Sequence, residues 1–266
     1  MKRCAGAFRT GTPGESSWIF LGAKEELELL SVDGGTDASL WILTVGLVSS
    51  FDLGQTKIVN LIQGWISSGS IMGACLATPC SSWSIALHGP PGSSWQPVRS
   101  RSFIYGFRNL NPAAQARLRL GNSLARSSVR IIKCLLKSEL PCVLENPDSS
   151  LLFDFPPLKT LTKKFKADDD RFDMCGFGTR WRKRTKLRRW GAPSVGHNGF
   201  CRGRKGLCSF SLHHHIVLQD HDPESGKLWS SLAQTYPSQL CSAVAVSLCH
   251  ASEARDLRIL FQRVGL

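Results

Sequence analysis

An apolar segment, a long amphipathic segment and a second apolar segment follow one another in the chain, and this order constrains the fold most. "SIMGACLA" at residues 70–77 has the length of a strand buried on both faces of a parallel sheet. Residues 112–140 carry apolar side chains at steps of three and four, which indicates a helix that begins at Pro112. "PCVLENP" is a second short strand, ended by Pro147. Such a strand, helix and strand form a crossover between parallel strands, so we predict an α/β domain.

Composition divides the 266 residues into one domain and two terminal segments. Residues 1–22 are expected to be a flexible arm, residues 23–250 the folded domain and residues 251–266 a C-terminal tail. Near the start of the domain, "LELLSV" before "DGGTD" fits either a strand or a helix. Residues 191–226 lack periodicity and are expected to form a small irregular insertion that contains Cys and His. The three aspartates at 168–170 are expected to lie in a solvated turn.

Positive charge is the main feature of the composition. The chain has 33 Lys and Arg against 20 Asp and Glu, a formal net charge of +13, and "TRWRKRTKLRRW" at residues 179–190 alone holds seven basic residues. Nucleic acid is the simplest partner, whereas a nuclear-import signal or a solvated basic face explains the charge equally well. The basic residues expected to contact nucleic acid are Arg99, Arg101, Arg180, Lys183 and Lys186. Trp83, Trp95 and Trp181 either stack on bases or pack in the core.

The chain has no apolar stretch near the ~20 residues needed to cross a bilayer, and its first residues do not resemble a secretory signal. We therefore expect a soluble intracellular protein, nuclear or cytoplasmic, with no membrane partner. In that compartment its ten cysteines would be reduced thiols.

Cys and His side chains in the insertion offer metal ligands. Cys201, Cys208 and the histidine run at 213–215 have the ligand types of a tetrahedral zinc site, with His215 the better histidine candidate. The alternative is an exposed histidine run beside two ordinary thiols.

Polar residues follow three candidate strands of the predicted sheet. They are Gly34 and Gly35, then Cys80, and then Glu145 with Asn146. Ligands of parallel α/β sheets bind at the carboxyl ends of the strands. A thiol and a carboxylate that meet there suit covalent chemistry on a heterocycle.

Pro79-Cys80, then Glu145-Asn146, then the basic strand "CGFGTRWRKRTKL" resemble, in this order, motifs of the cytosine-C5 methyltransferases. These are class I enzymes that use S-adenosylmethionine. The resemblance spans roughly residues 27–246 and is most specific over 76–190. It implies a Rossmann-like class I methyltransferase fold, with a mostly parallel sheet flanked by helices. It also implies methyl transfer to C5 of cytosine, in DNA in preference to RNA.

The resemblance assigns roles to individual side chains. Cys80 would attack C6 of a cytosine while Glu145 hydrogen-bonds or protonates N3. Asn146 would hold the cysteine loop or the glutamate, and Arg182 and Arg184 would contact the base or phosphates. A helix beginning directly after Cys80 would help to lower the pKa of its thiol.

S-adenosylmethionine would bind, by the same resemblance, at Gly34, Gly35, Asp52 and Pro79, with Asp52 accepting from the ribose hydroxyls. "VDGGTD" lacks the aromatic residue and the later glycines of the family's cofactor loop. Two alternatives follow. One is a catalytically impaired relative that binds nucleic acid, and the other is a zinc-stabilised nucleic-acid-binding module in which Cys80 is structural.

Overall fold

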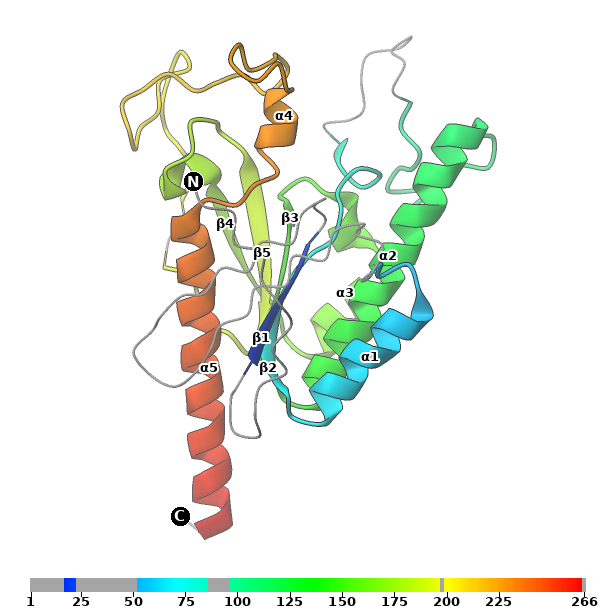
Figure 1. Ribbon diagram of the computed structural model, residues 1–266, viewed down its shortest axis with the longest axis vertical. Coiled ribbons are helices and arrows are strands. Elements are labelled where there is room, and N and C mark those ends of the chain that lie inside the picture. Colours follow the sequence, from blue (N-terminus) through cyan, green and yellow to red (C-terminus); the bar gives the residue numbers. More distant parts are fainter. Residues whose placement is uncertain (1–16, 23–51, 86–95, 197–198, 265–266) are drawn as a thin grey trace.

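The computed structural model describes residues 17–22, 52–85, 96–196 and 199–264, with a five-stranded mixed sheet at its centre (Figure 1). The strand order is β1-β2-β3-β5-β4. β2 lies parallel to β1 and to β3, whereas β5 is antiparallel to both β3 and β4. The strands are β1 (Ser17–Gly22), β2 (Ile71–Ala77), β3 (Cys142–Pro147), β4 (Asp168–Asp173) and β5 (Arg184–Trp190).

The prediction of a mostly parallel sheet is wrong, because the four strand pairs divide equally into parallel and antiparallel. The cause is the connection between β4 and β5. It contains only the 3-10 helix η3 (Met174–Phe177) and a turn, which is too short for the crossover that a parallel pair needs. β5 therefore returns antiparallel and enters the sheet between β3 and β4.

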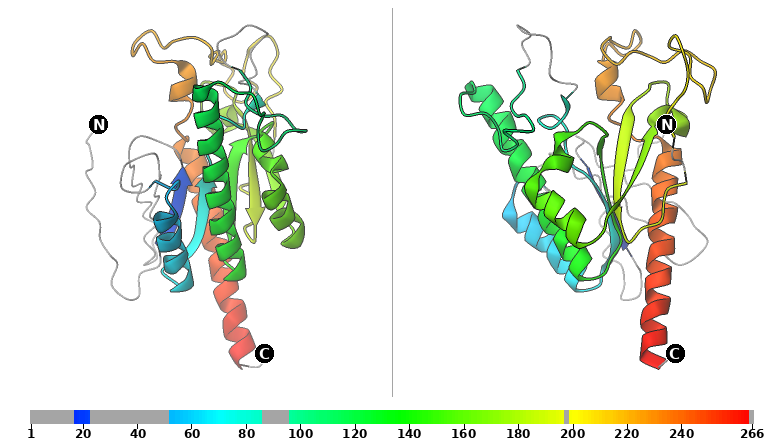
Figure 2. Two further views of the ribbon diagram at one scale, coloured as in Figure 1. Left: turned by 90° about the vertical axis from the view of Figure 1, so that its right-hand side faces the viewer. Right: turned by 180° about the vertical axis from the view of Figure 1, so that it is seen from behind.

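The helices lie on both faces of the sheet (Figures 1 and 2). One face is covered by α1 (Thr56–Ser67), α2 (Pro112–Lys137) and α3 (Pro156–Lys164), and the other by α5 (Ser238–Val264). The short elements η2 (Leu151–Asp154) and α4 (Trp229–Leu232) complete the described helices. Each face has its own buried apolar cluster, and the first includes Ile62, Leu76 and Ile132, whereas the second includes Val143, Leu187 and Val244.

Alternation along β3 sends neighbouring residues to opposite faces of the sheet. Leu144 belongs to the cluster under α1, α2 and α3, whereas Val143 belongs to the cluster under α5. Glu145 shares the face of Val143, and Asn146 shares that of Leu144. At the end of β3, Glu145 therefore faces the side of the sheet covered by α5, and Asn146 faces the side covered by α1, α2 and α3.

The central prediction from the sequence is confirmed. β2 and β3 form as expected, α2 begins at Pro112, and the two strands joined by that helix are parallel. A helix also forms near the C-terminus, as α5. "LELLSV" and the glycine loop lie outside the described residues.

Two expectations about other segments are wrong, and the C-terminal segment is helical. Residues 17–22, assigned to a flexible arm, form β1, because six registered positions pair with β2. The aspartates at 168–170 belong to β4, where Asp169 and Asp170 pair with arginines of β5. The expected C-terminal tail is helical as far as Val264, because α5 continues through it.

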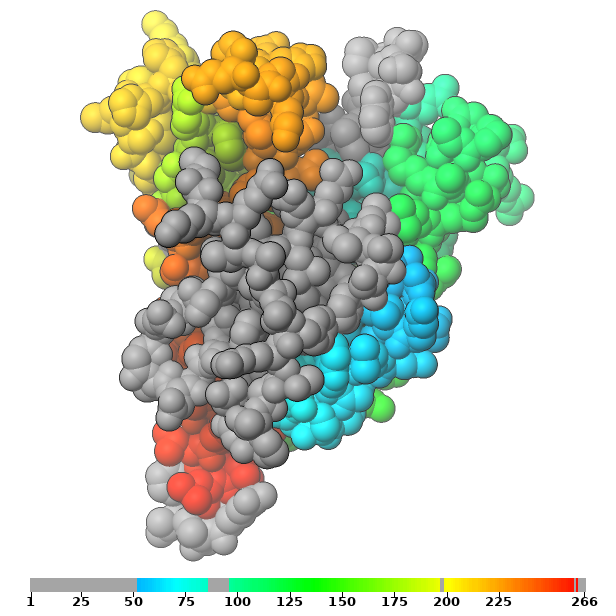
Figure 3. All heavy atoms as spheres, viewed as in Figure 1, coloured from blue at the N-terminus to red at the C-terminus, as the bar shows by residue number. Residues whose placement is uncertain are grey.

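The carboxyl ends of β2 and β3, the first turns of α2 and the irregular insertion gather at one end of the molecule (Figure 1). We call residues 199–228 the Cys/His lobe. Its backbone makes isolated bridges but no named helix or strand. The lobe and the start of α2 stand at the same end in the space-filling view (Figure 3). Among the described helices, none has the length and apolar character to cross a membrane.

Candidate functional site

Cys80 lies in a tight turn directly after β2. Its carbonyl oxygen accepts hydrogen bonds from the backbone N–H groups of Trp83, at 2.9 Å, and Ser84, at 2.8 Å. The side chain is half-buried. Residues 81–84 form a turn and not the start of an α-helix, so the helix N-terminus expected beside this thiol is wrong.

Asn146 fixes the segment that carries Cys80. Its Nδ2 donates to the carbonyl of Thr78, at 2.6 Å, and to that of Glu145, at 2.9 Å. Thr78 is held from the other side as well, because its hydroxyl lies 2.7 Å from that of Ser128 on α2. The end of β2 is therefore locked between β3 and α2, as expected for an asparagine that holds the cysteine loop.

Glu145 lies opposite Ala77, the last residue of β2, and its side chain is buried. Its Oε2 accepts a hydrogen bond of 2.5 Å from the hydroxyl of Tyr236, which stands just before α5. Its Oε1 is buried and has no hydrogen-bond partner among the described residues. A buried carboxylate oxygen without a partner is unfavourable, so this atom is suited to meet a ligand.

Lys183 brings a positive charge to the same place. Its Nζ donates to the carbonyl of Ala233, at 3.3 Å, and lies 6.0 Å from the ring centre of Tyr236. Burial raises the pKa of the Cys80 thiol, Lys183 opposes that rise, and Glu145 adds to it. The pKa of this thiol therefore lies above its ordinary value, because burial outweighs the lysine.

Tyr236 stays a hydrogen-bond donor. Burial raises the pKa of its hydroxyl well above the ordinary value, and the Glu145 carboxylate raises it further. The four side chains of Cys80, Glu145, Lys183 and Tyr236 form one charged and polar group at the carboxyl end of the parallel strands.

Arg99 holds the cysteine turn onto α2. Its guanidinium donates to Ser82 and to Asn122, and lies 3.4 Å from the centre of the Trp83 ring. Both Arg99 and Trp83 are fully buried. The predicted contact of Arg99 with nucleic acid is therefore wrong, and of the two alternatives for Trp83 the structure shows packing in the core.

Arg182 and Arg184 point to a carboxylate rather than to Cys80. The Nε atoms of these arginines lie 2.9 Å and 3.3 Å from the two oxygens of Asp173, which is fully buried. The same aspartate accepts the backbone N–H of Cys201, at 2.8 Å. The structure thus places Lys183, which lies between them in the sequence, near Cys80, and it places the two arginines near the Cys/His lobe.

The remaining predicted nucleic-acid residues differ in exposure. Lys186 is buried between Asp148 and Asp169, so its predicted contact with nucleic acid is wrong. Arg101 is exposed and lies 3.3 Å from Asp154, and Arg180 is exposed beside Trp229.

Two of the predicted cofactor residues, Asp52 and Pro79, belong to the described residues, and Pro79 directly precedes Cys80. The Asp52 carboxylate accepts the N–H of Gly54, at 2.7 Å, just before α1, and Pro79 is half-buried in the cysteine segment. Gly34, Gly35 and Trp95 lie outside the described residues.

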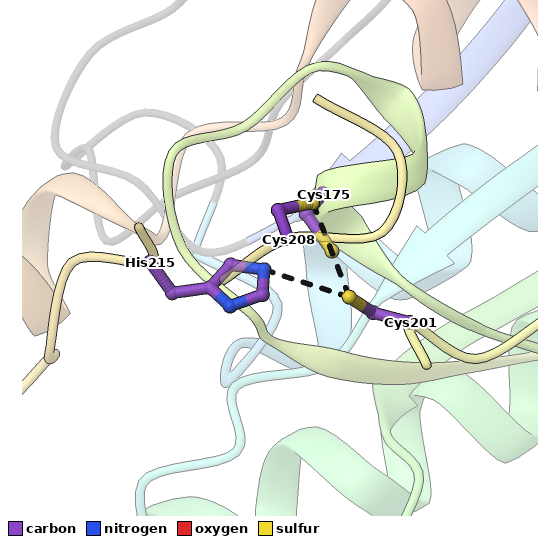
Figure 4. A group of neighbouring side chains, drawn as sticks. All are labelled: Cys175, Cys201, Cys208 and His215. Atoms are coloured by element: carbon purple, nitrogen blue, oxygen red, sulfur yellow. Dashed lines mark hydrogen bonds between the residues drawn. The ribbon is translucent and has the colours of Figure 1, made fainter. Parts of the chain in front are cut away.

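A second group of side chains lies where η3 meets the Cys/His lobe. The potential ligand atoms of Cys175, Cys201, Cys208 and His215 all lie within 4.8 Å of one another (Figure 4). Cys201 Sγ is 3.9 Å from Cys208 Sγ and 3.8 Å from His215 Nε2. Zn–S bonds of about 2.3 Å in a tetrahedron place two sulfurs about 3.8 Å apart. The spacing therefore matches a four-coordinate metal site.

Hydrogen bonds from the lobe point at the sulfurs. Ser209 donates its N–H to Cys201 Sγ at 3.2 Å and its hydroxyl at 3.4 Å, and Phe210 donates its N–H to Cys208 Sγ at 3.4 Å. Burial raises the pKa of Cys201, but these Ser209 bonds and others bring it to about 7. Donors of this kind orient and stabilise thiolate ligands.

The sequence missed Cys175, Lys183 as a neighbour of Cys80, and Tyr236. Cys175 lies 26 positions before Cys201 by their numbers, and no local spacing connects them. Tyr236 carries no motif, although it is one of only two tyrosines in the chain. Lys183 directly precedes β5, and strand alternation extended from Leu187, which packs under α5, would place Lys183 on the same face; this is the signal that points to it.

The chain was compared with known protein families, curated proteins and solved structures, and no match was found in any of them.

Proposed function

We propose that this protein transfers a methyl group from S-adenosylmethionine to C5 of cytosine in DNA, with Cys80 as nucleophile. The observation that carries the proposal is the meeting of Cys80 and Glu145 at one edge of the sheet, with Asn146 bonded to the cysteine segment. The order of the Pro-Cys, Glu-Asn and basic segments along the chain supports it.

In the first step the Cys80 thiolate forms a bond to C6 of the base, and the C5–C6 π electrons move toward C5. Glu145 holds a proton at N3, which lets the ring accept this charge. Transfer of the methyl group to C5 would leave S-adenosylhomocysteine, and a base would then remove the C5 proton, which would restore the C5–C6 double bond and expel the Cys80 thiolate. Lys183 would favour the thiolate form of Cys80, because its positive charge opposes the effect of burial.

S-adenosylmethionine would supply the methyl group as an electrophile. Asp52 fits a role in holding it, since in the described part of the chain its carboxylate accepts only the Gly54 N–H, through Oδ1. The second oxygen is available to a ribose hydroxyl. Pro79 would lie beside the cofactor, next to the nucleophile.

DNA as the partner is supported by the net charge of +13 and by exposed basic residues near the Cys/His lobe. Arg180, Arg182 and Arg202 are all exposed there. Phosphate contacts of this kind would offset the cost of moving a base out of the duplex, about a few kcal/mol.

The test of this function is covalent trapping on duplex DNA that contains 5-fluorocytosine. With S-adenosylmethionine present, the wild-type protein should form an adduct that survives denaturing electrophoresis, because fluorine cannot leave C5 as a proton does. Cys80→Ala should abolish the adduct. Cys249→Ala, at a half-buried thiol on α5, is the matched control and should leave it intact. Equal behaviour of wild type and Cys80→Ala would disprove the mechanism.

We also propose that Cys175, Cys201, Cys208 and His215 bind Zn²⁺ and that the metal stabilises the Cys/His lobe. The four-ligand geometry and the N–H···S bonds support this role. A site in which all four positions are protein ligands is structural rather than catalytic. The four-ligand group also supports the alternative function, a zinc-stabilised nucleic-acid-binding module. The trapping experiment distinguishes this alternative from the enzyme, because a binding module would form no adduct.

Metal analysis of the purified protein should find about one equivalent of Zn²⁺. Cys208→Ser should lose it, and a strong chelator should lower the Tm by roughly 5 °C or more, because zinc binds the folded lobe. Cys249→Ser should retain the metal. Metal-free protein that is as stable as the purified form would rule out the site.

A further inference from the structure

Tyr236 occupies an unusual place beside the candidate nucleophile. It comes from the segment between α4 and α5, yet its hydroxyl reaches Glu145 at the carboxyl end of β3, at 2.5 Å. Its ring packs against the apolar cluster under α5. Packing of the ring therefore fixes the position of the Tyr236 hydroxyl.

The two oxygens of Glu145 have different surroundings. Oε2 accepts the Tyr236 hydroxyl, whereas Oε1 is buried without a partner in the described part of the chain. A carboxylate can rotate about its last bond, and this rotation exchanges the two oxygens. A donor fixed on one oxygen prevents that exchange and leaves the other oxygen in one defined direction.

The connection between α4 and α5 is anchored at a second point. Lys183 Nζ donates to the carbonyl of Ala233, three residues before Tyr236, and lies 6.0 Å from the tyrosine ring. Ala233 itself is buried. The tyrosine thus sits on a backbone tied to the basic segment before β5.

We propose that Tyr236 is a positioning residue that fixes Glu145 through Oε2, so that Oε1 alone faces the target base. This inference rests on the proposed methyl transfer, because it gives Glu145 its role toward the base. It adds a residue from the C-terminal part of the chain to the site.

The first test measures the hydrogen bond without any activity. Tyr105 is the only other tyrosine, so in Tyr105→Phe the tyrosinate absorbance at 295 nm reports Tyr236 alone. We expect this absorbance to appear only well above the pH at which an ordinary tyrosine ionises. Adding Glu145→Gln should move the titration to lower pH, while circular dichroism shows that both variants remain folded. Ordinary titration in both variants would overturn the inference.

The second test measures the rate of adduct formation with 5-fluorocytosine DNA in single turnover. Tyr236→Phe keeps the ring and should slow this rate by roughly tenfold to hundredfold. In the Glu145→Gln background the same change should cost less than about twofold, because the two residues act as one unit. An equal loss in both backgrounds would show that the tyrosine acts only through the fold, and would overturn the inference.

The two tests separate this inference from the proposed function. If wild-type protein forms no adduct, the methyl transfer fails, while the absorbance titration still reports the pairing of Tyr236 with Glu145. If the adduct forms and Tyr236→Phe leaves its rate unchanged, the methyl transfer stands and the role of Tyr236 is rejected.

Discussion

Gly121 shows how one residue on α2 sets the place of the nucleophile. In sequence terms a glycine in the middle of a helix only weakens it, by about 1 kcal/mol relative to alanine. In the structure, a Cβ at this position would lie 2.0 Å from Ser82 Oγ and 3.2 Å from Arg99 Nη2. The missing side chain therefore lets the turn after Cys80 approach the helix closely.

We predict that Gly121→Ala destabilises the protein by about 2 kcal/mol, because the overlap outweighs the gain in helix propensity. The adduct with 5-fluorocytosine DNA should also form more slowly, since the turn that carries Cys80 must move. Urea unfolding measures the first effect. Gly64→Ala on α1 is the matched control, because a Cβ there meets no atom within 4 Å. That change should stabilise the protein by about 0.5–1 kcal/mol.

A buried carboxylate, Asp173, links β4, the basic segment and the Cys/His lobe. Asp173 ends β4 and accepts from Arg182, from Arg184 and from the backbone N–H of Cys201. A second tie lies nearby, where the N–H of Ile216 donates to the carbonyl of Arg180 at 2.9 Å. The metal-site residue Cys201 is therefore linked to the basic segment through Asp173, and Ile216, the residue after His215, is bonded to that segment directly.

We predict that Asp173→Ala weakens zinc binding as well as stability, because it leaves the Cys201 N–H without its acceptor. Asp169→Ala is the matched control. Asp169 also pairs with basic residues of β4 and β5, but at the other end of the strands and away from the lobe. Asp169→Ala should lower the free energy of unfolding by about 1–3 kcal/mol and leave the zinc affinity unchanged. Competition with a chromophoric chelator measures the affinity. Equal zinc affinity in Asp173→Ala and wild type would contradict the coupling.

The pH dependence of stability should follow from the same two carboxylates. Burial raises the pKa of Asp169 and of Asp173, but bonds to their arginines bring both below the ordinary value. Each therefore stabilises the folded state above the unfolded pKa of about 3.9, and this contribution is lost as the pH falls through the folded-state value.

At the scale of the whole molecule, the sequence predicts the half of the fold in which strands and helices alternate. β2, α2 and β3 follow from apolar runs and from steps of three and four, because each of these elements buries a regular face. β4 could not be predicted in this way. Its run of aspartates reads as a solvated turn until arginines of β5, distant in the sequence, lie opposite them.

The residues of the candidate site also divide into those that the sequence predicts and those that only the folded structure reveals. Cys80, Glu145 and Asn146 were predictable, since each follows a recognisable strand. Their partners Tyr236, Lys183 and Arg99 come from other parts of the chain, and only the folded structure brings them together. Similarly, Cys201, Cys208 and His215 were predicted as metal ligands, whereas Cys175 joins them through the turn after β4.

The opposite directions of Glu145 and Asn146 limit how the protein can change in evolution. One residue bonds toward α5 and the next bonds toward α2. An insertion or deletion of one residue within β3 would exchange the two faces and break both sets of bonds at once. Length variation should therefore accumulate in loops that carry neither these bonds nor metal ligands, while the residue count of this strand stays constant.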